Sequence, residues 1–226
     1  MKIQTCVPYI FAVTGILIVF ILIVNRALKK YDPLEEPKGL VLLAIMGVEM
    51  VDNMCQKDTN PEIAENLGPY VGSIALYIFF ASISGLLSFE APTGNLSVTL
   101  ALAGVTVFLI EYYSIKYNGI KEYVHQLMEP VAPFIVMNLI SKISPLLSLS
   151  MRLCCNIIAG SIIMQIIYAG TALISSYIPV IGTFNFLGVA LAPVFHAYFD
   201  LFAGALQTYI FMTLTVMFIG KELPKE

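Results

Sequence analysis

Five long apolar stretches dominate the chain, and none of them alternates with the period of a β-strand. The first three, residues 7–25, 67–89 and 96–115, are each about the twenty residues that a membrane-spanning helix needs. The last two, 131–177 and 179–220, are about forty residues each and far exceed that length at about 1.5 Å per residue. A transmembrane β-barrel would alternate apolar and polar positions. The pattern therefore predicts an all-α polytopic membrane protein with about five transmembrane helices, the last two forming a long, strongly tilted hairpin.

A sixth apolar segment, residues 39–53, differs from the five. It is too short for a comfortable span, and it carries Glu49 and Asp52 three residues apart on one helical face. A helix with one polar face of this kind lies in the membrane interface. We predict an interfacial helix on the inner side, and a single transmembrane domain over residues 1–226.

The basic residues give the expected orientation. If the N-terminus lies outside, nine lysines and arginines fall on the inner side and one, Lys2, on the outer side. This distribution satisfies the positive-inside rule and predicts a C-terminus on the inner side. The nine are Arg26, Lys29, Lys30, Lys38, Lys57, Lys116, Lys121, Lys221 and Lys225.

The composition agrees with a membrane protein and narrows the chemistry. Of the 226 residues, 58% are hydrophobic and 12% are charged, whereas soluble chains carry roughly a quarter charged residues. A net charge of -3 does not favour nucleic-acid binding. The four cysteines have neither zinc-ligand spacing nor a short disulfide framework, so we expect no metal and no cofactor. Cys154 and Cys155 lie in an apolar run, which indicates packing.

Four charged residues stand in or beside the long apolar stretches: Glu111, Lys142, Arg152 and Asp200. A charge at the centre of a transmembrane helix costs about 2.5 to 3.5 kcal/mol or more, so each is a candidate functional residue. Lys142 and Glu111 lie within snorkelling reach of the inner interface, which favours a lesser role. Arg152 is too deep for snorkelling. A structural salt bridge with Asp200 is the alternative to a functional role.

The neighbours of Arg152 form a narrow stripe. At 100° per residue, Ser148 and Asn156 lie about 40° to either side of it. Ser161 and Gln165 fall on the opposite face of the same helix, outward of Arg152. The stripe thus combines one cation, one amide and small residues, and it predicts a site that faces another polar group.

A second set of polar residues shares one face of the last stretch. His196, Asp200 and Gln207 lie within about 40° of one another, with Asp200 about 10 Å outward of Gln207. Together with Arg152 they predict a polar path that opens outward and ends at a deep cation. Arginine is a poor proton carrier because its pKa exceeds about 12. Its expected role is electrostatic, and the moving carboxylate must come from another subunit.

Four segments resemble the a subunits of F-type ATP synthases of the bacterial type. Residues 148–160, SLSMRLCCNIIAG, are similar to the family's signature SLxLRLFGNxxAG, with Cys154-Cys155 in place of Phe-Gly. Residues 200–211, DLFAGALQTYIF, resemble its LQAxxF motif, and 92–99 and 113–119 resemble its weaker middle motifs.

The resemblance implies a non-catalytic subunit that forms two half-channels against a rotating c-ring. It also implies a peripheral-stalk b subunit, the remaining ATP synthase subunits and a bacterial plasma membrane around the chain. Arg152 matches the essential arginine that faces the ring carboxylate, and Asn156 and Gln207 match the amides beside it. H⁺ is the expected ion, with Na⁺ as the alternative.

Two positions depart from the family pattern in the outer half-channel. Asp200 stands where relatives carry histidine or glutamate, and Ser161 stands where many carry glutamate or histidine. The resemblance therefore leaves the usual two-residue relay incomplete. We expect His196, one turn outward of Asp200, to compensate for it.

Other classes of membrane protein fit the sequence less well. A secondary transporter could hold a buried arginine, but such folds usually show two matched halves. A structural scaffold would not explain why the polar residues lie on narrow stripes. The chain has no HExxH motif or Ser/His pair for an intramembrane hydrolase, and no phosphate-binding loop.

Overall fold

The computed structural model describes residues 3–31, 37–87, 91–128, 134–176 and 185–223. These residues form helices and no strands, which confirms the all-α prediction. The helices are α1 (Ile3–Lys29), α2 (Leu40–Asp58), α3 (Pro61–Ile83), α4 (Leu96–Met128), α5 (Ile135–Ser176), α6 (Phe186–His196) and α7 (Ala203–Glu222). Two short 3-10 turns, η1 (Ser84–Leu87) and η2 (Pro92–Gly94), follow α3 and precede α4, and a π-helical segment, η4 (Ala197–Phe202), joins α6 to α7.

Five segments of the described chain are long and apolar enough to cross a membrane. They are Val7–Lys29, Pro61–Leu86, Leu96–His125, Ile135–Ser175 and Leu187–Glu222. Each contains or largely contains one of the predicted spans, so the expected number of spans is confirmed. The helix α2 is not among them. Its place in the inner interface, like the exact limits of the spans and the single domain, stays a prediction.

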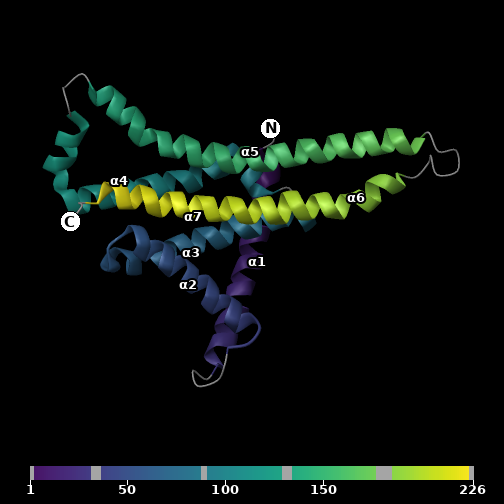
Figure 1. Cartoon of the computed structure of the whole chain (residues 1–226), viewed down its shortest axis with the longest axis horizontal. Helices are drawn as coiled ribbons and strands as arrows, with labels where there is room; N and C mark the ends of the chain where they lie inside the picture. Colours follow the sequence, from purple (N-terminus) through teal and green to yellow (C-terminus); the bar gives the residue numbers. More distant parts are fainter. Residues whose placement is uncertain (1–2, 32–36, 88–90, 129–133, 177–184, 224–226) are drawn as a thin grey trace.

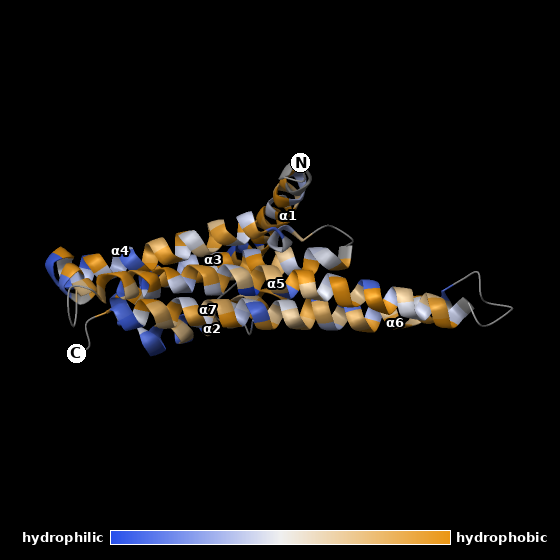
Figure 2. Ribbon diagram, turned by 90° about the horizontal axis from the view of Figure 1, so that it is seen from above, coloured by the Kyte–Doolittle hydropathy of each residue, from blue (hydrophilic) through white to orange (hydrophobic). Residues whose placement is uncertain are grey.

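The long helices lie side by side, and α1 crosses them (Figure 1). The α5 helix runs beside the continuous rod of α6, η4 and α7, while α3 and α4 lie against the same pair. With 42 residues α5 is about 63 Å long, roughly twice the thickness of the hydrocarbon core. Figure 2 shows hydrophobic ribbon along these helices, with many hydrophilic stretches near the C-terminus.

Local sequence explains where several helices begin and bend. Pro61 opens α3, since the proline ring suits the first helical position. The side chain of Asn185 caps α6 by accepting a hydrogen bond from the Gly188 amide at 2.9 Å. Gly119 bends α4 with a positive φ of 80°, which glycine adopts without steric cost. These positions set the lengths and directions of the rods.

The core consists of two clusters of buried side chains. The first joins α2, α3, α4 and α7 near the C-terminus and includes Cys55, Leu67 and Ile219. The second joins α3, α4, α5 and α7 and includes Leu149, Leu153 and Phe211. Because Leu149 and Leu153 flank Arg152 along α5, the second cluster fixes which face of α5 turns inward.

Candidate functional site

Arg152 lies on the outside of the described chain. Leu149 and Leu153 are 1% and 2% exposed and pack into the core, while Arg152 itself is exposed. The inward turn of the two leucines therefore directs the guanidinium away from the chain's own interior. Among the described residues no ion pair joins Arg152 to Asp200, because the Asp200 carboxylate pairs with His196 instead. The salt-bridge alternative thus finds no support here.

The stripe around Arg152 is partly exposed. Ser148 is exposed and Asn156 is half-buried. The opposite side of this turn packs against η2: the Cys154 thiol lies 3.4 Å from the Gly94 carbonyl oxygen. Cys154 is buried and Cys155 is exposed, so the packing predicted for the pair holds only for the first.

Gln207 is a buried amide with an unused donor. The residue is 7% exposed, and its Nε2 has no hydrogen-bond partner within the part of the chain that the structure describes. Leaving a buried donor unpaired costs about 1 to 3 kcal/mol, so such a group calls for an explanation. A partner supplied from outside this chain, water or a second subunit, would provide one.

Three hydrogen-bonded polar groups link α5 to the end of α6 and to η4. The Tyr168 hydroxyl lies 3.1 Å from His196 Nε2, and His196 Nδ1 lies 2.8 Å from Asp200 Oδ2. With a neutral histidine, Nδ1–H donates to the carboxylate and Nε2 accepts from the tyrosine hydroxyl. The sequence predicts His196 and Asp200 at one site, and the structure brings them into direct contact.

Asp200 occupies space that a glycine leaves open. A Cβ atom placed on Gly85 would lie 3.2 Å from Asp200 Cγ, so the carboxylate sits directly against the turn that follows α3. One turn along, a Cβ on Gly204 would lie 2.6 Å from Ser82 Cβ. Asp200 and Gly204 therefore face the same neighbour, and any side chain at Gly85 would compete with the carboxylate for its position.

An open pocket of about 440 Å³ adjoins these polar groups. His196 and Tyr168 line it together with apolar side chains, among them Leu86, Pro193 and Leu201. The side chains of His196 and Asp200 are 33% and 21% exposed. The pocket therefore gives access to the histidine, whose two ring nitrogens allow it to accept a hydrogen bond at one and donate at the other.

The π-helical segment changes the geometry that a regular helix would give. It spans Ala197–Phe202 and contains Asp200, so His196 and Gln207 do not follow one uninterrupted 3.6-residue period. The sequence places His196, Asp200 and Gln207 on one face of a regular α-helix. In the structure this alignment holds only locally, for the contact between His196 and Asp200. Insertions of this kind are frequent at functional sites. Neither the hydrophobic periodicity nor the motifs of the sequence signal this insertion.

Among the described residues, two candidates on α5 form no hydrogen bond with Tyr168, His196 or Asp200. Ser161 is exposed, and its hydroxyl donates to the Ile158 carbonyl of its own helix at 2.8 Å. Gln165 is also exposed. Tyr168, which the sequence analysis missed, stands seven residues after Ser161 and so lies on the same face. That heptad spacing is the signal that could have identified it.

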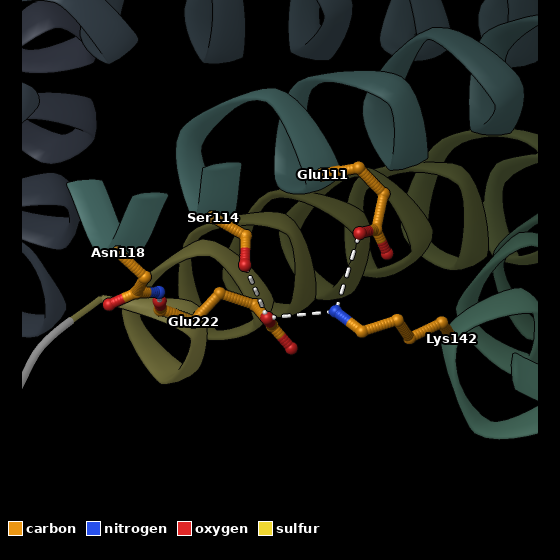
Figure 3. A network of polar contacts seen from close by, with 5 residues as sticks. All are labelled: Glu111, Ser114, Asn118, Lys142 and Glu222. Atoms are coloured by element: carbon orange, nitrogen blue, oxygen red, sulfur yellow. Dashed lines mark hydrogen bonds and ion pairs between the residues drawn. The ribbon is translucent and has the colours of Figure 1, made fainter. Parts of the chain in front are cut away.

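A second polar network lies at the opposite end of α5 (Figure 3). Lys142 Nζ is 3.3 Å from Glu111 Oε2 on α4 and 3.0 Å from Glu222 Oε2 on α7. Ser114 donates a hydrogen bond to the same Glu222 oxygen at 2.9 Å, and Asn118 donates to the Glu222 carbonyl at 2.6 Å. Lys142 and Glu111 are thus paired with each other, and Glu222 is a partner that the sequence analysis missed.

Comparison with known proteins identifies one family. The ATP synthase A chain family matches residues 7–220. The protein named ATP synthase subunit a from Hydrogenobaculum sp. (strain Y04AAS1) is 33% identical over 196 residues, 79% of this chain and 82% of the relative. That from Bacillus subtilis (strain 168) is 28% identical over 185 residues, 78% of this chain and 76% of the relative. That from Desulforamulus reducens is 28% identical over 182 residues, and the aligned part spans 64% of its length.

Proposed function

Because this chain belongs to the ATP synthase A chain family, we propose that it carries ions, with H⁺ as the expected ion, along two half-channels formed against a rotating c-ring. As a member of the family it is a multi-pass membrane subunit of an ATP synthase and not its catalytic part. It works with other subunits of that complex. Arg152 lies between the two half-channels and faces the carboxylate of the ring.

The observation that carries this proposal is the exposure of Arg152 on the surface of a lipid-embedded helix. A charged side chain facing hydrocarbon is costly, so it needs a counter-charge. The described residues of this chain provide no ion pair to it, and Asp200, the acid that the sequence offers as a partner, is paired with His196. A carboxylate on a second subunit meets the requirement. A fixed cation at this point also repels a positive ion and prevents direct passage from one half-channel to the other.

The outer half-channel begins at the pocket beside His196. An ion entering from outside reaches His196 and Asp200, and continues toward the ring carboxylate near Gln207 and Asn156. The unpaired Gln207 amide supports this route, since water or a carboxylate in the path would satisfy it. After almost a full rotation of the ring the ion leaves inward, past Arg152. Each charge that crosses the membrane delivers about 2.3 kcal/mol per 100 mV.

The histidine and aspartate together replace the relay that relatives build differently. Ser161 binds its own helix, so it leaves the second position of the usual pair without a titratable group. His196 lies in contact with Asp200 and supplies such a group. The proposal thus assigns the outer relay to His196 and Asp200. Ser161 and Gln165 on one face of α5, and Ser148 beside Arg152 on the other, contribute in lesser roles.

Other subunits and the lipid bilayer surround the chain in this proposed function. The c-ring covers the exposed face of α5 around Arg152, and a peripheral-stalk b subunit and the remaining ATP synthase subunits complete the complex. The chain lies in the lipid bilayer of a bacterial plasma membrane with its N-terminus outside and its C-terminus in the cytoplasm. The distribution of basic residues supports that orientation.

The central claim is tested by Arg152→Ala in the complete ATP synthase. We expect ATP synthesis driven by an ion gradient to be abolished, while assembly and ATP hydrolysis by the detached head stay unchanged. Arg26→Ala, an exposed arginine at the end of α1, is the matched control and retains synthesis. Normal gradient-driven synthesis by the Arg152 variant would contradict the proposal.

The choice between H⁺ and Na⁺ needs a separate measurement. In vesicles that contain the complex, ATP-driven proton pumping is compared with ATP-driven uptake of radioactive sodium. The histidine in the outer path favours proton transfer, because one ring nitrogen can accept while the other donates. Sodium uptake without proton pumping would favour the sodium-translocating alternative.

A further inference from the structure

We propose that Lys142 is a positioning residue for Arg152. It holds the first part of α5 in register against α4 and α7, and so adds to the packing of Leu149 and Leu153 that turns the arginine, ten residues further along, outward. Ten residues correspond to about 15 Å along the helix. The inference rests on the proposed function of Arg152 and adds a residue that acts on ion coupling without touching the ion.

Lys142 is held from two sides by carboxylates on different helices. Its ammonium lies between Glu111 of α4 and Glu222 of α7, at 3.3 and 3.0 Å (Figure 3). The side chains of the three residues are only 16%, 24% and 27% exposed. If α5 shifted along its axis, an ion pair to one helix could persist. Two acceptors on separate helices define one position for the ammonium group.

The partners of Lys142 are themselves fixed. Ser114 and Asn118 on α4 donate hydrogen bonds to the side chain and the carbonyl of Glu222. Beyond the bend at Gly119, the ring of Tyr123 lies 4.5 Å from Lys142 Nζ and covers the ammonium. The network therefore connects both parts of α4, the start of α5 and the last turn of α7.

Little apolar packing holds the first part of α5. None of residues 135–148 is buried, and the first buried side chains of the helix are those of Leu149 and Ser150. Exposed apolar side chains such as Met137, Ile140 and Ile143 are equally stable in lipid at any rotation, since lipid is as apolar as they are. Polar contacts therefore contribute strongly to the register of this segment: the Lys142 ion pairs, and the hydrogen bond that the Asn138 amide donates to the Leu127 carbonyl at 3.0 Å.

The rotation of α5 matters because the role proposed for Arg152 depends on where its guanidinium group points. A shift of one residue in register would turn its side chain by about 100°. Such a turn would move the cation out of line with a ring carboxylate and open a path between the half-channels. Without the Lys142 network we expect the complex to assemble but to couple poorly.

The test compares Lys142→Met and Lys142→Arg in the complete ATP synthase, with Lys221→Met as control. Lys221 is an exposed lysine beside Glu222 that the network does not use. The readout is the number of ions pumped per ATP hydrolysed, together with the passive ion leak after the head is removed. We expect Lys142→Met to lower the coupling ratio by about tenfold and to raise the leak, because small misplacements by distant mutations cost one to two orders of magnitude. Lys142→Arg and Lys221→Met should keep coupling near normal.

A second variant guards against simple misfolding. Glu111→Gln/Lys142→Met/Glu222→Gln removes all three charges at once and leaves no unpaired carboxylate. We expect it to assemble and to be as poorly coupled as Lys142→Met. Normal coupling in either variant, or failure of both to assemble, would overturn the positioning role. Arg152→Ala is measured in parallel: if it also couples normally, the proposed function itself fails, and if it alone loses coupling, only the role of Lys142 fails.

Discussion

Two polar networks stand near opposite ends of α5, and they differ in chemistry and in access to water. The first, which we call the inner network, consists of Lys142, Glu111 and Glu222, and the second, the outer network, of Tyr168, His196 and Asp200. Lys142 and Tyr168 are 26 residues apart, which corresponds to about 39 Å along the helix.

The inner network is built from groups that hold a charge, and the outer network from groups that can pass a proton. An ammonium is a donor only, and in the inner network it is clamped by two acceptors. A histidine can accept at one nitrogen while it donates at the other, and here it lines a pocket of about 440 Å³. The ammonium of the inner network suits a structural role between three helices, whereas the histidine of the outer network, beside an open pocket, suits the transport role that we propose for it.

The largest expected effect on ion transport comes from replacing the carboxylate of the outer network. Asp200→Asn keeps the shape but removes the proton acceptor, so we expect ion transport from the outer side to fall about a hundredfold. Asp58→Asn, at an exposed site at the end of α2, is the control. The readout is the rate of gradient-driven ATP synthesis. If an Asp200→Asn/His196→Ala double variant kept its full flux, the outer network would not be part of the path.

A glycine beside Asp200 tests whether its position matters as well as its charge. Gly85→Ala puts a methyl group 3.2 Å from Asp200 Cγ, and we expect a loss of about tenfold in the same transport assay. Gly72→Ala is a matched control, since a Cβ at Gly72 has no heavy atom within 4 Å. Equal activity of the two variants would show that the carboxylate tolerates displacement.

Tyr168→Phe removes only the hydroxyl at the far end of the outer network. Loss of one hydrogen bond of about 1 kcal/mol predicts a decrease of about fivefold in outer-side transport. Tyr112→Phe, at an exposed position on α4, should leave the transport rate unchanged. A Tyr168 variant as fast as the Tyr112 variant would remove the tyrosine from the network.

The smallest effect concerns the closed packing near the inner network. Cys55 is fully buried in the cluster that contains Ile219, and burial, together with the charge of Asp52, raises the pKa of its thiol to about 11. At pH 8 about one thiol in a thousand is then ionised, and that fraction grows as the pH rises. Alkylation of Cys55 should be far slower than that of a cysteine introduced by Lys57→Cys, at an exposed site, with the other cysteines removed in both cases. Equal labelling would mean that this end is open to solvent.

Periodicity and composition were sufficient for the helices and for part of the candidate site. The apolar stretches predict the five spans, and the depth of Arg152 identifies it as unusual without any structure. The spacing of His196 and Asp200 is four residues, so their contact depends only on local helical geometry. Such features depend on neighbours along the chain, which a single sequence displays directly.

Other parts of the site depend on residues far apart in the chain. Lys142 meets Glu111 and Glu222 across 31 and 80 residues, and Tyr168 meets His196 across 28. The π-helical segment also breaks the period on which the alignment of Asp200 with Gln207 relied. Heptad spacing places Tyr168 on the face of Ser161, but no repeat or motif marks its contact with His196 or the contacts of Lys142.

The sequence by itself determined the number of spans, the helical class and the identity of the deep cation. Those properties follow from transfer into lipid, which each segment undergoes largely alone. The tertiary structure decided which face of α5 carries Arg152 outward, how Gly85 makes room for Asp200, and which acids hold Lys142. Those choices follow from the rotation and register of packed helices, which exist only once the helices are in contact.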